Sequence, residues 1–178
     1  KLNVPFYDKQ LLKIVAERSG LSEEVIEEKG EYNPSSLLYI IATKLSYGYS
    51  AGSKGEMPLP DQINAFQTEL IRELAEKESC VIIGRDADYI LREHPDCFHV
   101  FIHGKLDDRM KRVVTEHGVA PDEAKLHVLN RDAKRKQHYS HYTDRTWGMA
   151  ENYNLCLDSS YLGVEACVQL IIDNAKEN

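Results

Sequence analysis

Short apolar runs alternate along the chain with longer segments whose apolar positions recur at helical spacing. The runs predict strands over residues 3–8, 80–84, 97–103 and 154–158. Helices are predicted over 9–20, 23–30, 33–45, 105–118 and 163–176, and also starting at Asp61, Asp86 and Pro121. Strands that alternate with helices favour a mostly parallel sheet covered by helices on both faces. We therefore expect the α/β class.

Residues 46–60 break this alternation. The segment is rich in glycine, serine and proline and shows no period, which is typical of a mobile loop. Its "GSKGE" at 52–56 brings a glycine near a lysine, but it lacks the GxxxxGK[ST] spacing of a phosphate loop and follows no strand. We interpret it as part of the loop.

Composition narrows the class of protein. The chain has 178 residues and a net charge of −7, which suits a single domain over 1–178 and argues against non-specific nucleic-acid binding as its main role. The four cysteines form no CxxC pair, so we expect reduced thiols in a cytoplasmic protein. No apolar run approaches the roughly 20 residues needed to cross a membrane, so no membrane partner is expected.

Polar residues follow each predicted strand, where open parallel sheets bind their ligands. They are Asp8, Arg85 with Asp86, His103, and Asp158 with Ser159. Asp8 suits a hydrated Mg²⁺ or the proton of an attacking oxygen, or else it caps the next helix. Arg85 suits the forked binding of a phosphate, or else it pairs with Asp86 or Asp8.

Positive charge gathers near residue 133. The basic residues are Arg131, Lys134, Arg135, Lys136 and, further on, Arg145. They indicate either a visiting polyanion or a solvated helix face. A nucleic-acid groove with Tyr139 and Tyr142 as stacking platforms is another interpretation, which the net negative charge disfavours. His138 and His141 have a metal-like spacing but no carboxylate in register, so no metal site is expected.

Several motifs together resemble the cytidylate kinase-like family. They are "PFYDKQLL", "CVIIGRDADYIL", "VFIHGKLDDRMKRV", "RDAKRK", "HYTDRTWG" and "ENYNLCLDSSYLGVE", and they cover nearly the whole chain. The resemblance implies a P-loop kinase that moves the γ-phosphoryl group of ATP, with Mg²⁺, to a nucleoside monophosphate such as CMP or dCMP. It implies a three-layer fold with a parallel sheet, an acceptor-binding insertion over 31–60 and a basic lid over 121–147.

The same resemblance implies roles for individual residues. Asp8 matches an aspartate near the acceptor phosphate, and Arg131 with Arg135 matches the lid, so these three are the expected catalytic residues. Arg85, Asp86 and Lys134 are the expected substrate-binding residues. The partners implied are ATP and a small phosphate-bearing acceptor, and an oligomer is possible.

The sequence departs from the family pattern in two ways. It contains no glycine-rich phosphate loop, so we expect a βα unit of ~30 residues, including the central strand, before Lys1. The family pattern has arginines where this chain has Ile14 and Asn64, an aspartate where it has Ile83, and a lid arginine where it has His138. These replacements leave open an alternative, a nucleotide-binding sensor or regulatory protein without transfer activity.

Overall fold

The computed structural model describes residues 2–8, 10–19, 22–23 and 58–175. The strands are β1 (Phe6–Tyr7), β2 (Val81–Ile82), β3 (Val100–His103) and β4 (Leu155–Asp158). The helices are α1 (Gln10–Ser19), α4 (Leu59–Lys77), α5 (Ala87–Ile90), α6 (Leu106–His117), α7 (Ala124–Thr143), α8 (Ser159–Leu162) and α9 (Val164–Ala175), with a 3₁₀ turn at Ala150–Asn152. The predicted helices over 23–30 and 33–45 and the loop over 46–60 fall outside the described residues, except for residues 23 and 58–60.

The four strands form two parallel pairs. Phe6 lies opposite Val81 in the β1–β2 pair, and Val100 lies opposite Leu155 in the β3–β4 pair. The α/β class and the parallel pairing are therefore confirmed, but the expected single sheet is not, because β2 and β3 are not hydrogen-bonded to each other. A ladder requires strands about 4.8 Å apart, and the described part of the chain contains no ladder between β2 and β3.

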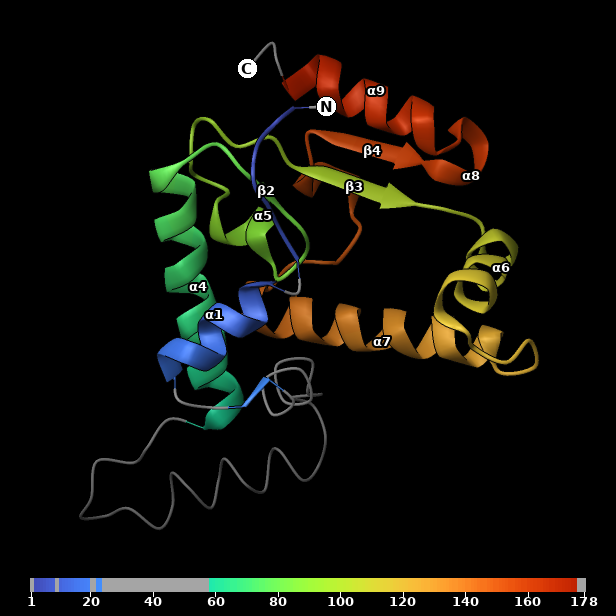
Figure 1. Ribbon diagram of the computed structural model, residues 1–178, viewed down its shortest axis with the longest axis horizontal. Helices are drawn as coiled ribbons and strands as arrows, with labels where there is room; N and C mark the ends of the chain where they lie inside the picture. The colour runs from blue at the N-terminus through green and yellow to red at the C-terminus, as the bar shows by residue number, and fades with distance from the viewer. Residues whose placement is uncertain (1, 9, 20–21, 24–57, 176–178) are drawn as a thin grey trace.

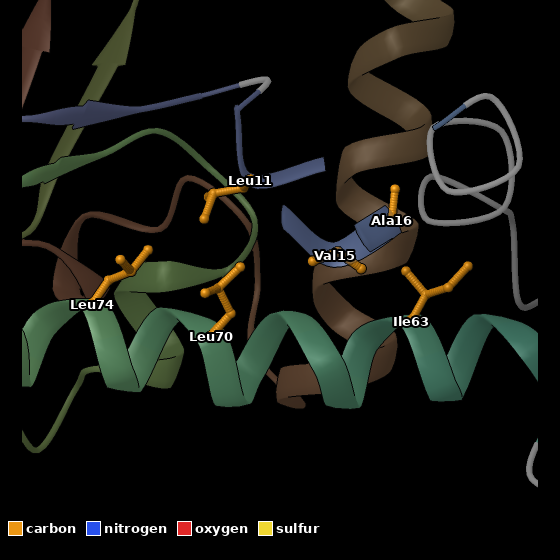
Figure 2. Close-up of a cluster of buried hydrophobic side chains, with 6 residues drawn as sticks. All are labelled: Leu11, Val15, Ala16, Ile63, Leu70 and Leu74. Carbon is orange, nitrogen blue, oxygen red and sulfur yellow. The ribbon is translucent and has the colours of Figure 1, made fainter. Parts of the chain in front are cut away.

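The main core joins α1 to α4. Figure 2 shows Leu11, Val15 and Ala16 of α1 facing Ile63, Leu70 and Leu74 of α4. The α4 residues recur at i, i+7 and i+11, which is one stripe of a helix. Each large side chain buried in this way contributes roughly 1.5–3 kcal/mol. Tyr7 and Ile82 pack against the same cluster, so the core also fixes β1 and β2.

A second cluster fixes α5. Ile71 of α4 packs with Ala87 and Leu91, and Ile82 and Cys97 lie against them. At the other end of the molecule, α9 lies along the β3–β4 pair and α7 runs across the opposite side (Figure 1). These contacts bring α5, the ends of the strands and α7 into one part of the fold.

One face of the β1–β2 pair is open. Tyr7 and Ile82 point to the core, whereas Phe6, Val81 and Ile83 are 54%, 40% and 48% exposed. Side chains alternate between the two faces of a strand, so these three share the face opposite the core.

Among the described residues, no helix combines the length and the apolar character needed to span a bilayer.

Candidate functional site at the carboxyl ends of the strands

The turn after β2 has a strained backbone. Gly84, Arg85 and Asp86 follow one another with φ of 68°, 57° and 54°, all in the left-handed region. Glycine adopts this conformation freely, but each of the other two residues costs roughly 1–2 kcal/mol there. The turn is closed by the Ala87 N–H, which donates to the Gly84 carbonyl at 3.1 Å. Strain of this kind clusters at binding and catalytic sites, so the turn is the strongest local sign of function.

Arg85 and Asp8 leave adjacent strands at the same edge. The Ile83 N–H donates to the Tyr7 carbonyl at 2.9 Å, which sets residues 8 and 84–86 just beyond paired strand ends. Both side chains are half-buried. Within the described part of the chain, Arg85 makes no ion pair with Asp8 or Asp86. The alternative in which Arg85 forms a structural ion pair with either carboxylate is therefore wrong.

The partner of Asp86 is His138 of α7. His138 Nε2 lies 3.0 Å from Asp86 Oδ2, and the two side chains are only 18% and 13% exposed. The distance suits an ion pair when the imidazole is protonated, but the atoms are not aligned for a hydrogen bond, so Asp86 Oδ2 and His138 Nδ1 are buried without such a partner. The sequence suggested that His138 is a replaced lid position or half of a metal-like pair with His141, and neither interpretation predicted this contact.

The basic residues of α7 lie on the stripe that ends at His138. Arg131, Lys134 and Arg135 precede it by seven, four and three residues, which places all of them on one side of a helix. All three side chains are exposed. The structure thus brings the predicted lid residues onto the face of α7 that carries the Asp86 contact.

Tyr139 and Tyr142 face inward rather than outward. Tyr139 is 1% exposed and donates to Asp88 Oδ2 at 2.6 Å. Tyr142, which is half-buried, donates to Asp61 Oδ1 of α4 at 2.9 Å. Tyr139, as a core residue, therefore offers no ring face on which a base could stack, whereas the role of Tyr142 as a stacking platform is not tested by its hydroxyl contact.

Asp88 is a half-buried acid that sequence reasoning did not single out. Desolvation raises the pKa of its carboxyl above the ordinary value, and the hydrogen bond from Tyr139 acts in the opposite direction. Burial, together with that hydrogen bond, also raises the pKa of the Tyr139 hydroxyl. The sequence carries one sign of this arrangement. Asp86 and Asp88 lie two residues apart, and the residues that contact them in the structure, His138 and Tyr139, are adjacent in the chain.

Asp132 of the "RDAKRK" motif has a structural role. Its carboxylate accepts two hydrogen bonds from Arg109 of α6, at 2.8 Å and 2.6 Å. This bond raises the pKa of the Arg109 guanidinium. The forked pair holds α7 against α6 and leaves the neighbouring Arg131 on the exposed side.

The carboxyl ends of β3 and β4 form a second, tightly bonded edge. Asp158 Oδ1 accepts from the Ser160 N–H at 2.9 Å and so caps α8. Ser159 Oγ donates to the His103 carbonyl at 2.8 Å. The polar atoms of Asp158 and Ser159 are therefore used to hold the loops, and the candidate site centres on the β2 turn.

Comparison with known proteins identifies the family of the chain. The model of the cytidylate kinase-like family matches residues 1–161. The chain belongs to the cytidylate kinase-like family. None of the curated proteins compared matches it. Among solved structures, it is similar to an uncharacterized protein from Eubacterium ventriosum ATCC 27560, with 27% identity, a TM-score of 0.64, and coverage of 95% of this chain and 91% of that one.

Family membership confirms the resemblance drawn from the motifs. The cytidylate kinase-like match includes Asp8, the Gly84–Asp86 turn and the basic residues of α7. A kinase-like family suggests nucleotide substrates. The roles of individual side chains remain predictions.

Proposed function

We propose that the protein transfers the γ-phosphoryl group of ATP to a nucleoside monophosphate, with CMP or dCMP as the favoured acceptor. The observation that carries the proposal is the strained Gly84–Asp86 turn, which holds Arg85 at a strand end without an ion pair to Asp8 or Asp86. A guanidinium in this state is prepared to bind a phosphate through two parallel hydrogen bonds.

The roles follow from charge and position. Arg85 binds the acceptor phosphate. Asp86 binds the sugar or base of the acceptor after its contact with His138 is broken. Asp8 lies at the same edge, near the acceptor phosphate, where its carboxylate would help to hold the hydrated Mg²⁺ that accompanies ATP. Arg131, Lys134 and Arg135 neutralise charge on the transferring phosphoryl group, which is where electrostatic stabilisation contributes most to this reaction.

Mg²⁺ would arrive with ATP. Kinase sites hold this ion with one or two carboxylates and the nucleotide phosphates rather than with a cage of protein ligands. Asp8, a half-buried carboxylate at the strand edge, fits that requirement. The ion would draw charge from the phosphate oxygens.

A second candidate is a nucleotide-binding regulatory protein without transfer activity. Two observations favour it. Ile14, at a position where the family pattern has an arginine, packs against the α1–α4 core, so no cation reaches the acceptor from there. His138 stands where the family pattern has another arginine, and its imidazole lies against the Asp86 carboxylate. A site that lacks its polar partners discriminates weakly between bases.

Turnover separates the two candidates. The complete natural protein is incubated with Mg²⁺-ATP and a panel of nucleoside monophosphates, and release of ADP is followed by a coupled assay. We expect acceptor-dependent ADP formation with CMP and dCMP among the best acceptors. Saturable ATP binding without turnover on any acceptor contradicts the kinase and favours the regulatory protein.

A further inference from the structure

A polar depression of about 370 Å³ lies at the amino ends of β3 and β4. His99 precedes β3 and Asn154 precedes β4, and the two are joined because the His99 N–H donates to Asn154 Oδ1 at 2.8 Å. Its other lining residues are two arginines, two glutamates and two uncharged polar residues: Arg92, Arg145, Glu93, Glu151, Asn152 and Tyr153. The depression is therefore at the opposite end of these strands from His103 and Asp158.

Both of these arginines, Arg92 and Arg145, lie against the ring of Tyr89. The guanidinium carbons of Arg92 and Arg145 lie 4.1 Å and 5.2 Å from the centre of the Tyr89 ring. Arg92 is fixed further by a hydrogen bond from Nη1 to the Tyr89 carbonyl at 2.8 Å. Contact with an aromatic face orients a guanidinium while leaving its N–H groups available along the edge.

Arg145 is half-buried and forms no ion pair with any described carboxylate. Asp88 accepts a hydrogen bond from Tyr139, Glu151 is exposed, and Glu93, whose side chain is 85% exposed, pairs with Arg92 at 3.4 Å. The pKa of His99 is lowered, mainly by desolvation, while nearby Asp88 opposes the shift and Arg145 adds to it. A cation in this position attracts an anion.

We propose that this depression binds a small dianion of the phosphomonoester class, with its oxygens held by Arg92 and Arg145. Asn154 contributes a donor, since its amide oxygen is already used by His99 and its NH₂ group is not. The site is separate from the strained turn at Arg85, and its occupant is not the acceptor of the proposed reaction. Glu93 competes with the ligand for Arg92.

The test is a titration of inorganic phosphate and of pyrophosphate into the ¹⁵N-labelled complete protein at constant ionic strength. We expect saturable shifts of the amides of His99 and residues 152–154. Arg145→Gln weakens binding by roughly tenfold or more, because a charge-assisted hydrogen bond is lost. Arg112→Gln is the matched control: this arginine lies on α6, its side chain is 45% exposed, and it leaves binding unchanged.

Glu93→Gln makes the opposite prediction and guards against misfolding of the arginine variant. It removes the competing carboxylate and tightens binding by about two- to fivefold. Absence of saturable shifts in the wild type overturns the proposal, and so does equal affinity in Arg145→Gln or in Glu93→Gln. An Arg85→Ala variant separates the two sites, since it leaves these shifts intact whether or not the protein is a kinase.

Discussion

At the scale of the residue, Tyr139 fixes the contact between α7 and α5. It is the largest of the fully buried side chains in the described part of the protein. Its hydroxyl is the only described side-chain donor to Asp88 that the hydrogen-bond geometry supports, at 2.6 Å. Removing one partner from such a pair leaves the other buried and unsatisfied, which costs more than the hydrogen bond itself contributes.

Tyr139→Phe is expected to lower the free energy of unfolding by about 1–3 kcal/mol. The ring remains to fill the core, so the loss reports the hydroxyl and not a cavity. Urea unfolding followed by circular dichroism measures the change. Tyr161→Phe is the control, because Tyr161 is 83% exposed and its replacement should change stability by less than about 0.5 kcal/mol. Equal stability of Tyr139→Phe and the wild type contradicts the assigned role of this hydrogen bond.

At the scale of the element, α7 is a helix held by three neighbours. Arg109 ties it to α6, Asp88 ties it to α5 and Asp61 ties it to α4. In Figure 1 it spans the molecule from α6 to the region of α1 and α4. The basic stripe is consequently carried by a fixed helix in this state, and any closing motion over the phosphates must shift these contacts together.

The Arg109–Asp132 pair should show a measurable coupling. A double-mutant cycle with Arg109→Met and Asp132→Asn is expected to give roughly 1–2 kcal/mol, because the pair is bidentate and partly buried. The comparison is the Arg112–Glu116 pair on the same helix, which is exposed and 3.9 Å apart, and for which about 0.3–0.5 kcal/mol is expected. Similar coupling energies for the two pairs would show that the α6–α7 contact does not depend on this bridge.

Local sequence patterns predicted most helices and strands, but they did not predict which strands pair with one another. The helix from Asp61 and those over 105–118 and 163–176 correspond to α4, α6 and α9, since each has an apolar stripe. The strand over 80–84 shortens to Val81–Ile82, and α8 was missed because its four residues carry no period and only the Asp158 cap marks it. Which strands pair is decided by distant partners, so the division into two sheets was not visible in the pattern.

The candidate site was predicted unevenly for a similar reason. Asp8, Arg85 and Asp86 were found because residues after strands share an edge, and the structure places them there. The contacts of His138 and Tyr139 depend on the angle at which α7 crosses α5, which no local pattern encodes. The left-handed backbone of Arg85 was likewise invisible, since arginine does not signal this conformation, whereas aspartate at position 86 is a residue type that adopts it more often than most.

At the scale of the whole molecule, positive charge is distributed unevenly over an acidic chain. The net charge of −7 coexists with Arg85 at the strand edge and with the basic stripe of α7. Such a distribution focuses a local positive field where a phosphate-bearing substrate would bind. The central claim is that Arg85 holds that phosphate.

The kcat/KM for ADP formation by Arg85→Ala tests this claim most directly. We expect a fall of roughly 10²–10³-fold, as for loss of a cationic or oxyanion-type contact in a closed site, with unfolding behaviour close to that of the wild type. Arg112→Ala, on the exposed face of α6, should stay within about twofold. A folded Arg85→Ala variant that keeps the kcat/KM of the wild type would contradict the account.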